Sequence, residues 1–173
     1  QKHYGHIAVT SEQGEGATFT FYLPASESQA AAADEAAPEM VVGTGRILLV
    51  DDEQMIHRAM GRALKLLGYE VESFYEGAPA LRAYRDALGS DKAFDIVITD
   101  LTIPGGMGGR EVAEKLLELD PEARVLVSSG YSNDPVMANY GAYGFAGRVA
   151  KPFRIAELAN TVKRVLDGGQ IGD

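Results

Sequence analysis

Apolar residues in this chain follow two patterns, and each pattern predicts a different kind of element. Short runs of apolar residues, many of them β-branched, predict buried strands, and apolar residues three or four positions apart predict helices that bury one face. The short runs are residues 47–50, 71–74, 96–99, 125–127 and 148–150. The helical spacing is found within residues 56–67, 78–88, 111–119, 135–140 and 155–166. Strands and helices therefore alternate along the chain.

The first and the last of these helices have the clearest apolar stripes. In the first helix the stripe consists of Ile56, Ala59, Met60, Ala63 and Leu67, and Gly68 marks its end. In the last helix it consists of Ile155, Leu158, Ala159, Val162, Val165 and Leu166. We expect these side chains to face the core.

Five strands that alternate with five helices predict an α/β fold with a central five-stranded parallel sheet, because right-handed crossovers place helices on both faces of such a sheet. We expect the flavodoxin-like strand order 2-1-3-4-5. In this order every loop that leaves the carboxyl end of a strand lies at the same rim, where open α/β sheets bind their ligands. Residues that directly follow the strands are therefore the first candidates for a functional site.

The amino-terminal residues show a third pattern, in which apolar and polar residues alternate. The apolar positions are Ile7, Val9, Phe19, Phe21 and Leu23, with Gly14 and Gly16 between the two runs. This pattern predicts a β-hairpin. Because an isolated hairpin is only marginally stable, residues 1–24 either pack on other parts of the protein or belong to a larger sheet.

Changes in composition indicate the domain boundaries. Residues 25–44 are rich in Ala, Ser and Glu and lack apolar periodicity, which predicts a linker. The alternating strands and helices fill residues 45–168, and residues 169–173 form a tail. We thus expect a hairpin fragment, a linker and one globular domain.

Overall composition narrows the class of protein. Of the 173 residues, 46% are hydrophobic and 24% are charged, as is typical of globular proteins. The net charge of −9 argues against nucleic acid as a direct partner, because phosphate binding requires a basic face. The absence of cysteine excludes disulfides, thiolate metal sites and cysteine nucleophiles. No apolar run approaches the about 20 residues of a membrane span, and no secretory signal pattern is present, so we expect a cytoplasmic location.

Polar groups follow four of the predicted strands. They are Asp51 and Asp52, Asp100, Ser129, and Lys151. Three carboxylates at one rim repel one another unless a cation is bound, and Mg²⁺, which takes a few oxygen ligands and keeps several waters, suits an open rim. Lysine supplies a point charge for a phosphoryl oxygen, and serine supplies a hydroxyl donor. The set predicts phosphoryl transfer to an aspartate, with Asp100 as the nucleophile.

Three further features have simpler interpretations. Asp51 or Asp52 is also expected to cap the first helix, as Asp commonly does. The glycine-rich residues 105–109 lack the Lys-Ser/Thr ending of a P-loop and predict a flexible turn. His57 lies in a helical pattern without a second ligand at metal spacing, which favours a surface or packing role over metal binding.

As a set, the residues after the strands resemble the receiver domain of two-component response regulators. The matching motifs are Asp51-Asp52, Asp100, Thr102-Ile103-Pro104-Gly105, Ser129-Gly130 and Lys151-Pro152-Phe153. The resemblance covers residues 45–168 and implies the flavodoxin-like (βα)5 fold. It also implies that the domain catalyses its own phosphorylation and dephosphorylation, with Mg²⁺ as its cofactor.

The resemblance assigns a role to each matching acidic position. Asp100 would be the phosphoacceptor and a metal ligand. Asp52 would bind Mg²⁺ directly, and Asp51 would bind it mainly through water. The backbone carbonyl of Thr102 would complete the protein ligands.

The remaining matching positions would handle the phosphoryl group. Lys151 would pair with Asp100 and then with the phosphoryl group, and its bond to the following proline would be cis. Ser129 would swing toward the phosphoryl group and report its presence. Thr102 and Tyr131 would tune dephosphorylation by controlling the access of water. Arg148 departs from the pattern, because receivers often have Tyr or Phe three residues before the lysine, as the aromatic half of the switch.

The amino-terminal hairpin carries a second resemblance. Residues 5–24, with the glycine box Gly14-Glu15-Gly16-Ala17-Thr18, are similar to the carboxyl end of a histidine-kinase catalytic domain. The earlier glycine boxes and the helix with the phosphorylated histidine are absent from this sequence, so we expect no ATP binding by this part alone. Together the two resemblances imply a receiver domain at the carboxyl end of a hybrid sensor histidine kinase. Such a receiver is cytoplasmic even where the parent kinase is anchored in a membrane.

The implied reaction is transfer of a phosphoryl group from phosphohistidine to Asp100, followed by hydrolysis or by onward transfer. The expected partners are a kinase phosphohistidine domain, a histidine phosphotransfer protein or both, without direct contact to nucleic acid or membrane; whether the chain also forms a homodimer is left open by the sequence. One alternative is a receiver-like scaffold that binds partners without being phosphorylated, which Arg148 favours. Another is a Mg²⁺-dependent phosphatase of the haloacid dehalogenase class, although that class has Asp-x-Asp where this chain has adjacent Asp51 and Asp52.

Overall fold

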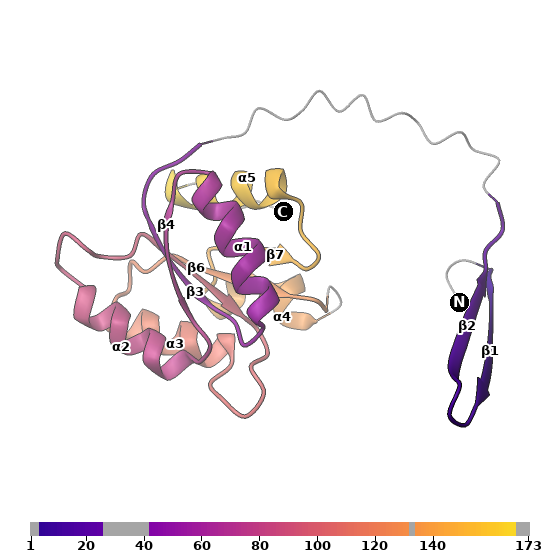
Figure 1. The fold of residues 1–173 in the computed structure, drawn as a ribbon. Coiled ribbons are helices and arrows are strands. Elements are labelled where there is room, and N and C mark those ends of the chain that lie inside the picture. The colour runs from indigo at the N-terminus through magenta and orange to yellow at the C-terminus, as the bar shows by residue number, and fades with distance from the viewer. Residues whose placement is uncertain (1–3, 26–41, 132–133, 169–173) are drawn as a thin grey trace. The chain divides into compact units, whose positions relative to one another are not determined.

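The computed structural model describes residues 4–25, 42–131 and 134–168, and the chain divides into two units, residues 1–37 and 38–173 (Figure 1). Residues 26–41 of the predicted linker and the whole predicted tail, residues 169–173, lie outside the described residues.

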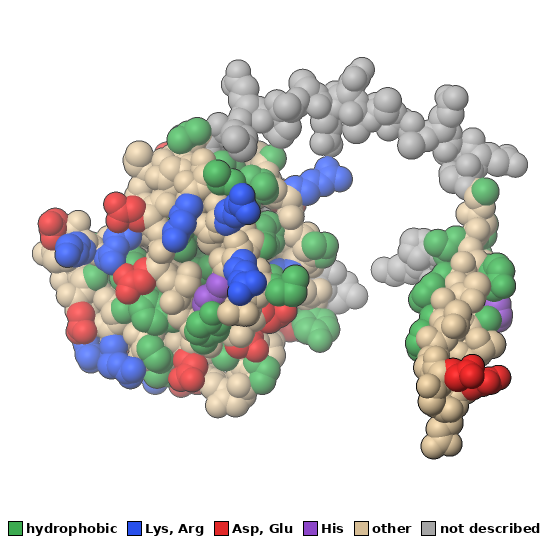
Figure 2. All heavy atoms as spheres, in the orientation of Figure 1, with side chains coloured by type: hydrophobic (Ala, Val, Ile, Leu, Met, Phe, Trp, Pro, Cys, Tyr) green, Lys and Arg blue, Asp and Glu red, His purple; other side chains and the backbone are tan. Residues whose placement is uncertain are grey.

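The first unit is the predicted antiparallel hairpin. Strand β1 (His6–Glu12) pairs with β2 (Gly16–Tyr22). The register places Ile7 opposite Phe21 and Val9 opposite Phe19, so these four side chains share one face of the hairpin. All four are more than half exposed, and apolar side chains are visible along the hairpin surface in Figure 2.

The second unit contains the predicted five-stranded parallel sheet. Its strands are β3 (Arg46–Val50), β4 (Glu70–Phe74), β5 (Ile96–Asp100), β6 (Val125–Ser129) and β7 (Gly147–Ala150). The order across the sheet is β4-β3-β5-β6-β7, and all neighbouring pairs are parallel. This is the order 2-1-3-4-5, so the predicted fold class is confirmed. Every residue of β5 and β6 is buried, as the apolar runs predicted for strands covered on both faces.

Helices cover both faces of this sheet (Figure 1). They are α1 (Gln54–Leu66), α2 (Gly77–Ala87), α3 (Gly109–Leu119), the short α4 (Pro135–Ala138) with the 3₁₀ turn η1 (Tyr140–Tyr143), and α5 (Ile155–Leu166). Met60 of α1 and Leu158 of α5 belong to one core cluster. Tyr84 of α2, Val112 of α3 and Met137 of α4 belong to the other. The two clusters hold the strands in place, so the carboxyl ends of the strands form one rim.

Three expectations for individual residues were wrong. Ala59 is exposed, because it lies about 100° around α1 from the buried Met60, and Leu64 packs in the core in its place. Ile155, the first residue of α5, is 45% exposed. The N-cap of α1 is Glu53 and makes no side-chain capping bond, so neither aspartate caps this helix.

Among the described residues, no helix combines the length and the apolar composition that crossing a bilayer requires.

Candidate functional site

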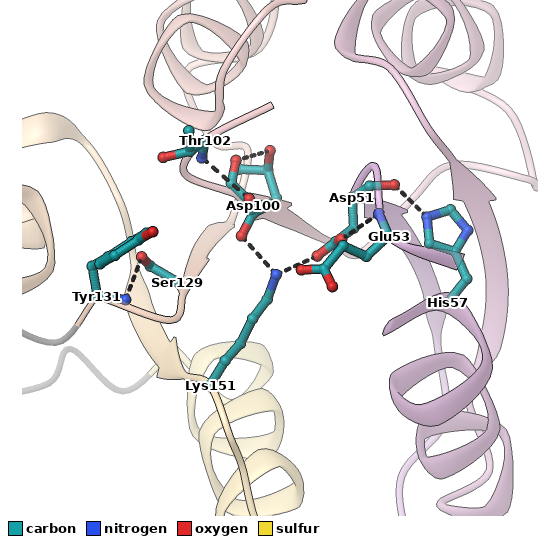
Figure 3. A network of polar contacts seen from close by, with 9 residues as sticks. Asp51, Glu53, His57, Asp100, Thr102, Ser129, Tyr131 and Lys151 are labelled. Carbon is teal, nitrogen blue, oxygen red and sulfur yellow. Dashed lines mark hydrogen bonds and ion pairs between the residues drawn. The ribbon is translucent and has the colours of Figure 1, made fainter. Parts of the chain in front are cut away.

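Four strands deliver polar side chains to the same rim of the parallel sheet (Figure 3). Asp51 directly follows β3, Asp100 is the last residue of β5, Ser129 is the last residue of β6, and Lys151 directly follows β7. The apolar residues before each of them fix the strand in the core, so the backbone leads each polar group to the edge of that core. The sheet thus gathers residues that are up to 100 positions apart in the chain.

The Lys151 ammonium lies between two carboxylates. Its Nζ donates to Asp51 Oδ2 and to Asp100 Oδ1, both at 2.7 Å. The exposed fractions of the three side chains are 11% for Lys151, 1% for Asp51 and 11% for Asp100. Water screens these charges only weakly, because all three side chains are nearly buried. The positive charge of Lys151 therefore acts on the carboxylates of both Asp51 and Asp100.

Backbone amides hold the other oxygen of each carboxylate. Asp51 Oδ1 accepts from the Glu53 N–H at 2.9 Å, and Asp100 Oδ2 accepts from the Thr102 N–H at 3.2 Å. The Asp51 N–H in turn donates to the carbonyl of Phe74, the last residue of β4, at 3.1 Å. Each buried oxygen therefore has a donor, and the orientation of both carboxylates is fixed.

Burial and charge act in opposite directions on the ionisation of this cluster. Burial raises the pKa of the Asp100 carboxyl above its ordinary value, and the hydrogen bond from Lys151 opposes this without cancelling it. Burial lowers the pKa of the Lys151 ammonium, but its hydrogen bonds to Asp100 and Asp51 outweigh burial and raise the pKa overall. Burial therefore outweighs the charges for Asp100 but not for Lys151. The ammonium has two anionic neighbours, whereas Asp100 has one cationic and one anionic neighbour. Lys151 is therefore held in its charged form.

An open cleft of about 730 Å³ lies above the cluster. Its lining includes Asp52, Glu53, Asp100, Thr102, Ser129, Tyr131 and Lys151. Asp51 is not part of this lining and lies below it, with 1% of its surface exposed. The structure thus brings together every predicted site residue except Arg148, with Asp51 in a supporting layer.

The hydroxyl of Ser129 is held toward the chain that follows it. Ser129 is 2% exposed, and its Oγ accepts from the N–H of Tyr131 at 3.1 Å. The Tyr131 side chain is 74% exposed at the edge of the cleft. As an acceptor in this bond, the hydroxyl keeps its own proton for donation to another group.

Arg148 points away from the cleft. Its guanidinium donates to the carbonyl of Met137 near the end of α4 and lies 5.7 Å from the centre of the Tyr140 ring. The position three residues before Lys151 is therefore occupied by an exposed cation that joins β7 to α4 and η1. The Lys151–Pro152 peptide bond is cis, as expected.

The glycine-rich residues 105–109 do more than turn the chain. A Cβ built at Gly109, the first residue of α3, would lie 2.4 Å from the Asp100 carbonyl oxygen. The N–H of Gly109 donates to the Leu101 carbonyl at 3.1 Å. Glycine is required here because α3 begins against the backbone that carries Asp100. Two adjacent glycines directly before a helical pattern are the signal that was available in the sequence.

The oxygen atoms of the cleft suit a hard divalent cation. Within residues 4–25, 42–131 and 134–168, no three His, Cys, Asp or Glu side chains are close enough to form a metal cage. Mg²⁺ needs no such cage, because in proteins it commonly binds one or two carboxylates and keeps several waters. Asp52 and Asp100 line one cleft beside the backbone of Thr102, while the Asp51 carboxylate is held by Lys151. The donor set therefore fits Mg²⁺ on the carboxylates of Asp52 and Asp100, with Asp51 one layer below them.

Comparison with known proteins relates this unit to one family. Residues 47–163 match the family described as response regulator receiver domain. The chain is 34% identical over 172 residues to the sensor kinase CckA of Brucella abortus (strain 2308), covering 94% of this chain and 18% of that protein. It is 29% identical over 121 residues to the response regulator receiver protein CpdR of the same organism, covering 70% of this chain and 96% of that protein. The chain thus spans less than a fifth of the length of CckA.

Solved structures show the same fold. A two-component response regulator of the LuxR family from Aurantimonas sp. SI85-9A1 superposes with a TM-score of 0.65 and 30% identity, covering 74% of this chain and 89% of that chain. The receiver domain of the sensor histidine kinase PA1611 from Pseudomonas aeruginosa PAO1 superposes with a TM-score of 0.63 over 72% of this chain and 99% of that chain. At 21% identity the second likeness concerns the fold alone; that protein was crystallised with a magnesium ion coordinated in its active-site cleft.

Proposed function

The chain belongs to the response regulator receiver domain family of two-component signalling, and from this premise we propose that Asp100 accepts a phosphoryl group from a phosphohistidine. The observation that carries the proposal is the shared ammonium of Lys151, which lies 2.7 Å from the Asp100 carboxylate at the floor of an open cleft. A buried carboxylate beside a cation and a hydroxyl has the components that phosphoryl transfer requires.

The reaction exchanges one phosphorus bond for another. An oxygen of the Asp100 carboxylate attacks phosphorus, the P–N bond to the donor imidazole breaks, and its electron pair returns to the imidazole nitrogen. Lys151 then shifts its hydrogen bond from the carboxylate to a phosphoryl oxygen, while Asp51 keeps the ammonium in place. Ser129 turns its hydroxyl proton toward a second phosphoryl oxygen.

A divalent cation would be held beside these residues. Asp52 and Asp100 would bind Mg²⁺ through their carboxylates, Thr102 through its backbone carbonyl, and Asp51 through water. When bound, the cation neutralises negative charge between the carboxylate and the phosphoryl oxygens. The Lys151 ammonium neutralises the same negative charge from the protein side. The proposal therefore requires Lys151 to remain protonated at neutral pH.

The residues at the edge of the cleft would set the lifetime of the phosphorylated state. Thr102 lies two residues after Asp100 and Tyr131 two residues after Ser129; both line the cleft, and Tyr131 is mostly exposed. Their side chains control the path of water to an acyl phosphate on Asp100. The product either hydrolyses slowly or passes its phosphoryl group to a histidine phosphotransfer protein.

The parent protein that we infer is a hybrid sensor histidine kinase. The similarity to the sensor kinase CckA covers 94% of the chain and so extends beyond residues 47–163 toward the hairpin. Residues 1–24 would be the last hairpin of the kinase catalytic domain, residues 25–44 the linker and residues 45–168 the receiver. The exposed apolar face of the hairpin supports this, because a two-stranded hairpin needs further strands or a helix to bury such a face.

The test is intact-protein mass spectrometry after incubation with acetyl phosphate and Mg²⁺. We expect one labile phosphoryl adduct on the wild type and none on Asp100→Asn. Asp86→Asn is the matched control, because Asp86 is an exposed aspartate of α2 and its variant should still form the adduct. An adduct on folded Asp100→Asn would refute the assignment.

A second candidate is a scaffold that binds partners without phosphorylation. The observation that favours it is Arg148, which occupies the usual aromatic switch position and contacts Met137 instead of the cleft. In that case the folded wild type would form no adduct with acetyl phosphate or with a phosphohistidine donor, and Mg²⁺ would not shift the NMR signals around Asp100.

A further inference from the structure

A partly buried histidine, His57, lies beside Asp51 on the side away from Lys151 (Figure 3). Nε2 of His57, in the first turn of α1, lies 2.5 Å from the backbone carbonyl oxygen of Asp51. A carbonyl can only accept a hydrogen bond, so Nε2 carries the proton and donates. This contact joins α1 to the peptide group between Asp51 and Asp52.

A second ring holds the imidazole in this position. The Tyr75 ring, directly after β4, stacks on His57 with centroids 4.2 Å apart and an angle of 7° between the planes. The residue before Tyr75 also takes part, because the Phe74 carbonyl accepts from the Asp51 N–H at 3.1 Å. The end of β4 therefore fixes Asp51 twice, once through its own backbone and once through the stacked histidine.

All polar groups of Asp51 are thus engaged. Its N–H, its carbonyl and both carboxylate oxygens have partners, which come from β4, α1, the Glu53 amide and Lys151. Asp52 differs, because its side chain is exposed and lines the cleft. The direction of the Asp52 side chain therefore depends on the peptide group that His57 holds.

We propose that His57 is a positioning residue, which together with Tyr75 orients the Asp51–Asp52 peptide so that the Asp52 carboxylate faces a divalent cation in the cleft. The inference rests on the proposed function, since it concerns the same site. Hydrogen bonds that orient the ligands of a metal ion contribute to its affinity, and their loss commonly lowers the metal affinity by about tenfold or more. His57 touches neither the cation nor the phosphoryl group, and acts through the peptide group alone.

The test compares four variants of the full chain. His57→Leu removes the hydrogen bond, His57→Gln restores a side-chain N–H donor, Tyr75→Leu removes the stacked ring, and Arg62→Leu is a control for leucine on the exposed side of α1. Backbone amide NMR signals of residues 51–53 are recorded without metal and during titration with MgCl₂, and thermal unfolding is recorded for each variant.

We expect His57→Leu to shift the metal-free amide signals of Asp51 and Asp52 and to raise the dissociation constant for Mg²⁺ by about tenfold. His57→Gln should bind Mg²⁺ nearly as well as the wild type, Tyr75→Leu should fall between, and Arg62→Leu should match the wild type. The Mg²⁺ concentration for half-maximal phosphorylation should rise in the same order.

An unchanged Mg²⁺ affinity in folded His57→Leu would overturn the proposal, as would a His57→Gln variant that is as impaired as His57→Leu. If His57→Leu fails to fold, Tyr75→Leu decides by the same criteria. Failure of the proposed function is seen separately, because the wild type would then take no phosphoryl group on Asp100 while the titration still ranks the variants.

Discussion

Replacement of Lys151 by alanine tests whether one ammonium compensates two buried carboxylates. In the wild type, Nζ lies 2.7 Å from Asp51 Oδ2 and 2.7 Å from Asp100 Oδ1. Lys151→Ala leaves both carboxylates in place with their amide donors but without a cation. The substitution removes no part of the apolar core, so its effect reports mainly on charge.

The expected cost follows from burial. Removal of one partner of a buried ion pair costs about 3–5 kcal/mol, because the other charge remains buried without compensation. Asp51 is 1% exposed but Asp100 and Lys151 are each 11% exposed beside an open cleft, and water can enter there after truncation. We therefore expect the lower end, a loss of about 3 kcal/mol in the free energy of unfolding at neutral pH.

The loss should depend on pH in a defined direction. Without Lys151, burial and the Asp51 charge raise the pKa of Asp100 further above the ordinary 3.8 of the unfolded chain. At pH values between 3.8 and the raised pKa of Asp100 in the folded variant, the folded state binds more protons than the unfolded state. The stability of the variant therefore falls as pH rises through this range. The deficit relative to the wild type should thus be largest at neutral pH and shrink on acidification. The stability that the Lys151 ammonium contributes in the wild type is present below 10.5 and is lost as pH rises through its raised pKa.

The assay is urea unfolding followed by circular dichroism at pH 7 and pH 5, since the chain has no tryptophan. Lys115→Ala is the control, because its 3.6 Å pair with Glu111 is exposed and should contribute about 0.5 kcal/mol or less. Addition of Mg²⁺ should reduce the deficit of Lys151→Ala by supplying another cation. A deficit of less than about 1 kcal/mol at pH 7, or one that grows on acidification, would refute the reasoning.

Three further predictions concern single residues of the site and its support. The ¹³C-detected titration of the Asp100 carboxyl should have its midpoint above 3.8, because burial raises its pKa, and a midpoint below that value would contradict the structure. Gly109→Ala should lower stability by about 1–3 kcal/mol in chemical denaturation, because its Cβ would lie 2.4 Å from the Asp100 carbonyl oxygen. Gly106→Ala, whose Cβ has only an ordinary contact at 3.4 Å, should be tolerated, and equal losses would argue against the close approach. Arg148→Ala should speed amide hydrogen exchange in residues 135–143 at a cost of about 1 kcal/mol, and unchanged exchange would show that Arg148 does not hold α4.

The sheet could be predicted because parallel strands are buried on both faces. This burial requires contiguous apolar runs, and such runs are visible without any knowledge of the partners of each strand. The helical stripes were less reliable at their margins. Ala59 is small enough to stand on either side of a helix, so its apolar character said little about the face that it occupies, and Ile155 stands at a helix end.

The candidate site could be predicted only as a set of residues at one rim. Strand topology brings Asp51, Asp100, Ser129 and Lys151 together, and topology follows from the pattern of elements. The position of Asp51 below the cleft, rather than in its lining, was not predictable. It depends on which carboxylates the Lys151 ammonium contacts at the same time. The stacking of His57 on Tyr75 joins two elements through side-chain geometry that spacing along the chain does not contain.

The direction of Arg148 belongs to the same class of unpredictable features. A long, exposed side chain on a strand can reach several neighbours, and the choice of the Met137 carbonyl depends on where the short helix α4 ends. From the sequence it could be predicted only that residue 148 lacks the aromatic ring of the usual switch position. Its effect on the switch remains a prediction.

The most direct measurement for the central claim locates the phosphoryl group itself. The wild-type protein is incubated with acetyl phosphate and Mg²⁺, treated with sodium borohydride to reduce the acyl phosphate to homoserine, digested and analysed by peptide mass spectrometry. We predict that homoserine replaces aspartate at Asp100 and at no other position. Homoserine at Asp51 or Asp52, or its absence from a folded protein that carries the adduct, would contradict the account.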